Sequence, residues 1–199
     1  MMAKRVFDML GAALALLLLA PLLLLVALAV RMDSPGPVFF RQERIGRHGV
    51  PFRIHKFRTM KAYAPTRGPQ VTLVHDERIT RIGRVLRHYR IDELPQFIDV
   101  LLGTMSLVGP RPEVPYFVAH YPAALKAQVL SVRPGITDPA ALAHIDEAEL
   151  LAGAADPERA YIERILPAKL ALQADYAARA TLWSDLVVLG RTLRVLVLR

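Results

Sequence analysis

The sequence lacks cysteine, which excludes disulfide frameworks, thiolate zinc sites, iron–sulfur clusters and cysteine nucleophiles. It also lacks a Gly-x-Gly-x-x-Gly or P-loop motif and a Gly-x-Ser-x-Gly motif, which argues against the standard dinucleotide, NTPase and serine-hydrolase folds. The six histidines show no paired spacing that would suit zinc. Charged residues make up only 22 % of the 199 positions and hydrophobic residues 53 %, which is too apolar for a disordered chain.

The net charge of +8 is distributed unevenly along the chain. Residues 1–137 hold 19 basic and 9 acidic side chains, whereas residues 138–199 hold 7 and 9. This excess of positive charge implies anionic partners for the first two-thirds of the chain: phosphates, nucleic acid or acidic lipid. No recognised DNA- or RNA-binding signature accompanies it.

Residues 9–30 form an apolar run without a charged side chain. As a helix, these residues would reach about 33 Å, which matches the ~30 Å hydrocarbon core of a bilayer. A cleaved signal peptide is the alternative, but the run is longer than the usual hydrophobic region of such a peptide. We therefore expect a membrane helix at the N-terminus.

Pro21 divides the apolar run into parts of 12 and 9 residues, each about half a bilayer long. Lys4 and Arg5 precede the run and eight Lys or Arg residues lie in 31–61, so the positive-inside rule places both ends in the cytoplasm. A helix–break–helix that enters and leaves by one leaflet satisfies both observations. A kinked single-pass helix remains the alternative, because proline is common in spanning helices.

The rest of the chain is predicted to be α+β and mostly helical, with a small β-hairpin. Residues 38–45 and 50–58 are candidate strands, and residues 62–76 resemble a loop. Apolar spacing predicts an amphipathic helix over 93–102, with Asp92 as its N-cap and Gly103 as its stop. Further helices are expected over 77–90, 113–130, 157–179 and 182–199. The last of these would lie on a membrane surface or pack in the core.

Asp92 and Glu93 are the first candidates for chemistry. A helix N-terminus favours negative charge, so Asp92 should stay ionised. An ionised aspartate can attack phosphorus, and a neighbouring glutamate can hold Mg²⁺ together with substrate phosphates. The simpler interpretation is an ordinary N-cap followed by a glutamate in the first turn.

Two basic positions are further candidates. Lys56 lies at the end of a predicted strand in which basic and apolar residues alternate. It could bind phosphate, or it could simply belong to a solvated face of the strand. Arg111 stands between Pro110 and Pro112, whose fixed φ angles make a rigid loop that suits bidentate phosphate recognition. The same residues could also form no more than a turn. Arg133-Pro134-Gly135 repeats the pattern more weakly.

Taken together, the motifs resemble those of the bacterial sugar transferases, small monotopic phosphoglycosyl transferases that start glycan assembly on polyprenol phosphate. Any one motif is weak, but their order behind a basic-flanked apolar segment is specific. They are Lys4-Arg5 with Phe7-Asp8, Gly36-Pro37-Val38-Phe39-Phe40-x-Gln42-x-Arg44-x-Gly46, Lys56-Phe57-Arg58-Thr59-Met60, Arg78-Ile79-Thr80-x-Ile82-Gly83, Asp92-Glu93-Leu94-Pro95-Gln96, Met105-Ser106-Leu107-Val108-Gly109-Pro110-Arg111-Pro112 and Arg133-Pro134-Gly135-Ile136-Thr137.

The resemblance implies a reaction at the cytoplasmic face of the bacterial inner membrane. A nucleotide-diphosphate sugar, usually a UDP-sugar, gives its sugar 1-phosphate to undecaprenyl phosphate through a phosphosugar-aspartate, and UMP is released. Residues 1–32 would form the re-entrant membrane helix, and residues 33–199 the catalytic domain with interfacial helices. The alternative is a single-pass membrane protein with a basic domain that binds nucleic acid. The resemblance itself implies no nucleic-acid partner. It leaves open whether the chain forms a homo-oligomer.

The resemblance also implies residue roles. Asp92 would be the nucleophile, and Glu93 with Asp92 would hold Mg²⁺. Lys56, Arg87 and Arg111 would neutralise phosphate charge, and Pro110, Pro112 and Arg133 would belong to the phosphate and nucleotide site. Lys4 and Arg5 would attract the lipid phosphate, and Pro21 would mark the membrane break.

The chain departs from the family's pattern at three places. Ala20-Pro21 replaces the common Ser-Pro, Thr104 stands where Asp often precedes Met-Ser, and Asp138-Pro139 replaces Gly-Trp. The last region could contribute to donor choice, so the resemblance does not carry over a particular sugar.

Overall fold

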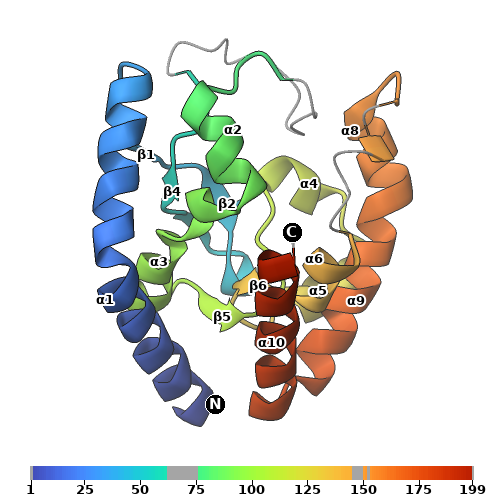
Figure 1. Ribbon diagram of the computed structural model, residues 1–199. Coiled ribbons are helices and arrows are strands. Elements are labelled where there is room, and N and C mark those ends of the chain that lie inside the picture. Colours follow the sequence, from blue (N-terminus) through green and yellow to red (C-terminus); the bar gives the residue numbers. More distant parts are fainter. Residues whose placement is uncertain (1, 62–75, 145–149, 152, 199) are drawn as a thin grey trace.

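The computed structural model describes residues 2–61, 76–144, 150–151 and 153–198. This part of the chain is mostly helical, with three small sheets of two strands each, which confirms the predicted class. Figure 1 shows a long N-terminal helix on one side and two long C-terminal helices on the other, with the strands and short helices between them. The predicted loop over 62–76 lies, except for Asp76, outside the described residues.

Helix α1 (Met2–Asp33) contains the apolar run. A few small side chains, among them Ala12, Val26 and Val30, are buried against the rest of the molecule, while most of its leucines point outward. Of the described helices, it alone is long and apolar enough to cross a membrane. Helical structure continues through Pro21, so the predicted break into two helices is not seen. Figure 1 shows a helix that is bent rather than broken.

Polar side chains fix the first turns of α1 to the other elements. The Asp8 carboxylate accepts hydrogen bonds from the Leu107 N–H at 3.1 Å and the Ser106 hydroxyl at 2.8 Å. The Lys4 ammonium lies 2.5 Å from an Asp185 oxygen and donates to the Val108 carbonyl at 3.1 Å. Asp8 and Asp185 are both buried. The contacts just named compensate their charges, which a buried carboxylate requires.

The last turn of α1 is fixed as well. The buried Arg58 guanidinium donates to the carbonyls of Ser34 at 2.7 Å and Pro35 at 2.6 Å, just beyond the helix end. The Asp33 carboxylate accepts the Ile82 N–H at 3.0 Å. Both ends of α1 are therefore bound to the same body of the protein.

The predicted hairpin is confirmed. Strands β2 (Glu43–Ile45) and β3 (Pro51–Arg53) pair antiparallel around the short turn Arg47–Gly49. Strands β1 (Phe39–Phe40) and β4 (Lys56–Phe57) continue the same antiparallel arrangement. Phe57 is buried against α1, in a cluster with Val26 and Val30, so β4 is anchored on α1.

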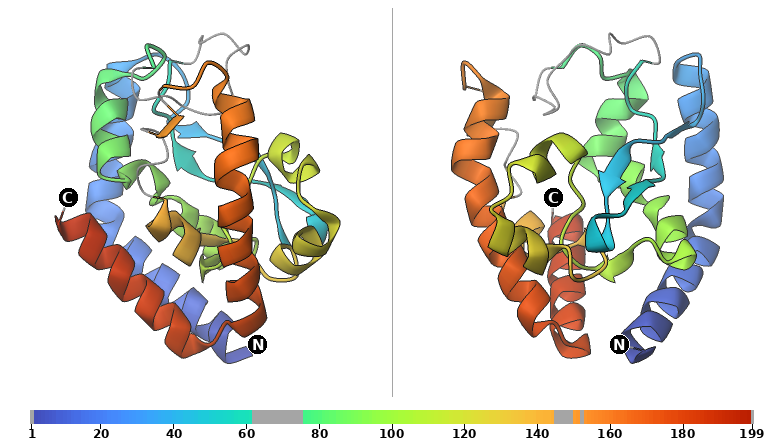
Figure 2. Two further views of the ribbon diagram at one scale, coloured as in Figure 1. Left: turned by 90° about the vertical axis from the view of Figure 1, so that its right-hand side faces the viewer. Right: turned by 180° about the vertical axis from the view of Figure 1, so that it is seen from behind.

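A parallel strand pair forms the centre of the fold. Strand β5 (Ser106–Val108) aligns with β6 (Gly135–Thr137), with Ser106 opposite Gly135 and Val108 opposite Thr137. A Cβ on Gly135 would lie 2.1 Å from the Gly109 nitrogen, so only glycine permits this close approach. The parallel alignment brings the segments that follow the two strands to one edge of the pair. The right-hand view of Figure 2 shows the short blue-to-cyan strands β1 to β4 between α1 and the orange helix of the C-terminal part.

Helices surround the strands, and most match the predicted ranges. Gly103 ends α3 in a left-handed conformation with φ of 86°, as predicted. The last helix, α10, packs inward through Asp185 and Val188, which is one of the two arrangements expected for residues 182–199, and its Trp183 is exposed. The helices after α1 are α2 (Arg81–His88), α3 (Gln96–Leu102), α4 (Pro115–Ala119), α5 (Ala123–Val129), α6 (Pro139–Ala143), α8 (Pro157–Ala160), α9 (Leu166–Arg179) and α10 (Leu182–Leu198), with a π-helical turn at Tyr161–Ile165.

Candidate active site

Asp92 and Glu93 lie in a 3₁₀ turn, Ile91–Glu93, between α2 and α3. Arg90 precedes the turn with φ of 56°, a left-handed conformation that costs a non-glycine residue about 1–3 kcal/mol. The predicted N-cap role of Asp92 is wrong, because α3 begins only at Gln96 and follows Pro95 without a side-chain cap. The separate turn directs the Asp92 carboxylate into the site instead.

Asp92 is a buried carboxylate, only 1 % exposed. The Lys56 ammonium lies 2.8 Å from its Oδ2 atom, as an ion pair that is not aligned as a hydrogen bond. Among the described residues, neither Asp92 oxygen accepts a hydrogen bond. Buried polar oxygens are normally satisfied, so this carboxylate has its bonding capacity available for a ligand.

Lys56 reaches the site from β4, whose position is fixed from behind. The Asp99 carboxylate on α3 accepts the His55 N–H at 2.7 Å and contacts the His55 ring nitrogen Nδ1 at 2.7 Å. These contacts attach the residue before Lys56 to the helix that follows Glu93. They therefore set the distance between the ammonium and the two carboxylates.

Glu93 is surrounded by three cations. Its Oε1 atom forms an ion pair with Arg111 and lies 3.2 Å from Lys56 and 4.0 Å from Arg90. Burial alone would raise the pKa of Glu93, but the charges of Arg111, Lys56 and Arg90 outweigh it and hold the pKa well below its usual range. Glu93 is therefore ionised at neutral pH.

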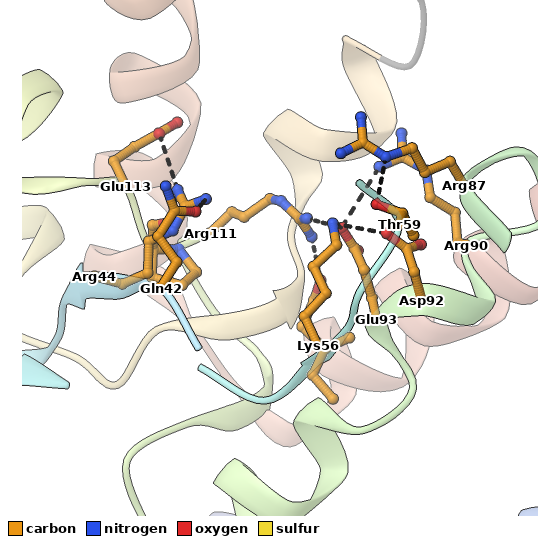
Figure 3. Close-up of polar contacts among 12 residues, drawn as sticks. Gln42, Arg44, Lys56, Thr59, Arg87, Arg90, Asp92, Glu93, Arg111 and Glu113 are labelled. Carbon is orange, nitrogen blue, oxygen red and sulfur yellow. Dashed lines mark hydrogen bonds and ion pairs between the residues drawn. The ribbon is translucent and has the colours of Figure 1, made fainter. Parts of the chain in front are cut away.

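Arg87 approaches the same site from the end of α2. Its Nε atom donates to the Thr59 hydroxyl at 2.8 Å, and Figure 3 shows its side chain beside Asp92. Burial lowers the pKa of Arg87, but an arginine keeps its charge in proteins. A further cation thus lies close to the free carboxylate.

Arg111 enters from the loop that follows β5, between Pro110 and Pro112. Its guanidinium donates to the Ile136 carbonyl at 3.1 Å and bonds Glu93 (Figure 3). The charge of Glu93 is the main reason why the pKa of Arg111 is raised. The structure thus brings together Lys56, Arg87, Asp92, Glu93 and Arg111, as the sequence analysis predicted.

This arrangement suits a substrate with a diphosphate. Cations from three separate segments surround two carboxylates, and one of these carboxylates has no hydrogen-bond donor of its own among the described residues. The cations would offset phosphate charge, and the free carboxylate could attack phosphorus.

Comparison with known proteins agrees with this geometry. The family description "Bacterial sugar transferase" matches residues 1–199. The chain belongs to the bacterial sugar transferase family.

Three similar proteins illustrate the range of this family. The UDP-glucose:undecaprenyl-phosphate glucose-1-phosphate transferase of Caulobacter vibrioides is 42 % identical over 193 residues, which cover 95 % of this chain and 67 % of that protein. The UDP-N-acetylgalactosamine-undecaprenyl-phosphate N-acetylgalactosaminephosphotransferase of Aeromonas hydrophila is 39 % identical over 195 residues, 97 % of this chain and 43 % of its own. The Escherichia coli K12 glucose-1-phosphate transferase is 45 % identical over 136 residues, 67 % of this chain and 29 % of its own. The match thus spans from under a third to two-thirds of these relatives.

The other predicted site residues have different partners. Arg5 donates to the carbonyls of Val100 at 2.7 Å and Leu101 at 3.1 Å, and Arg133 donates to the Gly103 carbonyl at 2.8 Å. Both arginines therefore cap the C-terminal end of α3. Lys4 is paired with Asp185, as described above. Roles of these three residues toward substrate stay predictions.

A buried network behind the Arg111 loop could not be predicted from local sequence patterns. Arg44 donates to the Pro112 carbonyl at 3.1 Å and lies 3.7 Å from Glu113. Glu113 also accepts from the Tyr161 hydroxyl at 2.5 Å and from Lys169 at 3.3 Å. Arg44 belongs to a motif quoted above, but nothing in its local pattern indicated a role. These contacts brace the loop from the side away from Asp92 (Figure 3).

The candidate site offers carboxylates that could hold Mg²⁺. The described residues contain no cluster of three or more acidic, histidine or cysteine ligands. Mg²⁺ takes one or two carboxylates plus substrate phosphates and water, which does not require such a cluster. Asp92, with two unbonded oxygens, and the adjacent Glu93 match that requirement.

Proposed function

We propose that this chain transfers a sugar 1-phosphate from a UDP-sugar to undecaprenyl phosphate. The observation that supports this most is the Asp92 carboxylate, which is buried, accepts no hydrogen bond from the described residues and lies among cations that suit a diphosphate. The names of the relatives supply the two substrate classes. Neither the motifs nor these relatives support the nucleic-acid-binding alternative.

The transfer would proceed in two steps. An Asp92 oxygen attacks the β-phosphorus of the UDP-sugar, the bond from that phosphorus to the bridging oxygen breaks, and UMP leaves. A phosphate oxygen of undecaprenyl phosphate then attacks the same phosphorus and breaks its bond to Asp92. The products are undecaprenyl-diphosphate-sugar and the free carboxylate, ready for another cycle. One small site can therefore take two dissimilar substrates in turn.

The other residues would serve the charge changes of these steps. Lys56 orients Asp92, and Arg87 and Arg111 bind the phosphate oxygens of the donor. Glu93 and Asp92 would hold Mg²⁺, which when bound neutralises charge on the diphosphate. Glu93 also fixes the Arg111 guanidinium, so losing it would disturb both cation and metal binding.

The placement of α1 supports a re-entrant membrane segment. A straight helix of 32 residues would be about 48 Å long. Because Asp8 and Asp33 near its two ends both bond the same domain, a domain on the cytoplasmic side would keep both ends there. Exposed Trp183 and Leu193 on α10 could add an interfacial contact. The active site would then lie where a lipid phosphate meets a soluble donor.

The function is tested by UMP release. Purified protein is incubated with a panel of UDP-sugars, undecaprenyl phosphate and Mg²⁺, and UMP is measured with and without the lipid acceptor. We expect sustained release with at least one donor only when the acceptor is present. No release across a panel that includes UDP-glucose and UDP-N-acetylgalactosamine would contradict the proposed reaction.

The re-entrant topology predicts that both ends of α1 resist labelling from outside the cell. The chain has no cysteine, so single cysteines can be placed at Met2 and at Ser34. A membrane-impermeant thiol reagent should label neither position in intact cells whose outer membrane is permeable, and both after disruption of the inner membrane. Labelling at residue 2 alone in intact cells would mean that the helix spans.

A further inference from the structure

Asp138 is a fully buried carboxylate that the proposed transfer does not use. Its Oδ1 atom accepts the Ala141 N–H at 2.5 Å and caps α6. Its Oδ2 atom accepts two more hydrogen bonds, from the Arg111 N–H at 2.9 Å and the Gln173 side chain at 2.7 Å. One carboxylate thus connects the Arg111 loop, α6 and α9.

The parallel strand pair explains this position. Asp138 directly follows β6, and Arg111 lies three residues after β5. Because the two strands run in the same direction, the segments that follow them meet at one edge. Their separation is kept small by Gly109 and Gly135, whose backbones touch at that edge.

The contacts leave Arg111 with few degrees of freedom. Its backbone N–H is held by Asp138, its guanidinium by the Ile136 carbonyl and Glu93, and its φ and ψ are restricted because Pro112 follows it. Of these restraints, only Asp138 also binds α6 and α9. It therefore links the loop to the C-terminal half of the protein.

We propose that Asp138 is a positioning residue, which holds Arg111 in the orientation needed to bind the diphosphate of the nucleotide-sugar donor. The inference rests on the proposed function, because it assigns Arg111 to the donor. Asp138 does not touch substrate, and it acts through the Arg111 backbone.

Asp138→Asn is the sharpest substitution. Asparagine has nearly the same shape, but its amide group replaces one acceptor oxygen by a donor. In one orientation of the amide, its NH₂ group would face the N–H of Ala141. In the other orientation, it would face the donor groups of Arg111 and Gln173. We expect kcat/KM for the donor to fall about tenfold or more, with a higher KM for the UDP-sugar.

A double-mutant cycle separates positioning from general loss of stability. In an Arg111→Ala background, Asp138→Asn should lower activity less than about twofold further, because the residue through which it acts is gone. Asp156→Asn is the matched control, since Asp156 caps α8 by the same kind of hydrogen bond but lies exposed and contacts no Arg111 atom in the structure. It should leave kinetics unchanged. Full additivity of Asp138→Asn and Arg111→Ala would overturn the proposal.

A second measurement does not depend on activity. Phenylglyoxal modifies accessible arginines, and its reaction at Arg111 can be followed by peptide mass spectrometry relative to Arg133 in the same protein. Asp138→Asn should accelerate modification of Arg111 about threefold or more, and Asp156→Asn should not. An unchanged rate in Asp138→Asn would overturn the positioning role. Absence of UMP release from the wild type would instead contradict the function, while the labelling result would still decide how Arg111 is held.

Discussion

Replacing Asp92 with asparagine should abolish the transfer, lowering UMP release by about 10³-fold or more. Asparagine keeps the shape of the side chain, but it cannot form the bond to phosphorus. Lys56 would keep Glu93 as a partner at 3.2 Å, so the variant should remain folded. UMP release by the variant at the wild-type rate would exclude Asp92 as the nucleophile.

The intermediate distinguishes a nucleophile from a metal ligand. Wild-type protein given the UDP-sugar without lipid acceptor should gain the mass of one sugar phosphate on the peptide that contains Asp92. Glu93→Gln should form the same adduct more slowly, because it weakens Arg111 and metal binding but keeps the attacking oxygen. Asp92→Asn should form none, and Asp175→Asn, at an exposed pair with Arg179 on α9, should behave as the wild type.

Arg111→Ala should reduce kcat/KM by about 10²- to 10³-fold, as expected for loss of one donor to developing phosphate charge. The substitution also removes the strongest charge that lowers the pKa of Glu93, so that pKa should rise. The control is Arg47→Ala, because Arg47 likewise donates to a backbone carbonyl, that of Ser131, but lies outside the site. Equal kinetic losses in both variants would contradict the role of Arg111.

The same variant should show a characteristic pH dependence of stability. In the wild type, the depressed pKa of Glu93 stabilises the fold above its ordinary value of 4.5, and this stability is lost as the pH falls through the lower folded value. Without Arg111 this contribution is smaller. The difference in unfolding midpoint between wild type and Arg111→Ala should therefore be largest near pH 7 and shrink below about pH 4.5. A difference that grows with acidification would contradict this sign.

Local sequence patterns predicted the elements that depend on neighbouring residues. The hairpin follows from two apolar-basic strands around Gly46-Arg47-His48-Gly49, and the end of α3 follows from Gly103. In each case the information lies within about ten residues, which is the range over which propensity and turn chemistry act.

The site depended on longer-range information. Motifs identified Asp92, Lys56 and Arg111, but their distances result from how β4, the Ile91–Glu93 turn and the β5 loop pack together. The prediction of Asp92 as an N-cap was wrong because no sequence pattern indicates the left-handed conformation of Arg90, which precedes the separate turn. Lys4 and Arg5 were predicted to attract the lipid phosphate. Only the fold shows that the immediate partners of their side chains are Asp185 and carbonyls of α3. Buried partners such as Asp138 and Glu113 likewise have no local signature.

The attachment of α1 bears on the order in which the protein can assemble during its synthesis. Lys4 is synthesised before its partner Asp185, which follows 181 residues later. Asp8 must wait for residues 106 and 107 before its carboxylate is bonded. The apolar helix is therefore synthesised well before these partners, and its first turns become fixed only after α10 has been made. A nascent chain that stops before α10 would leave the cation at the start of α1 without its counter-charge.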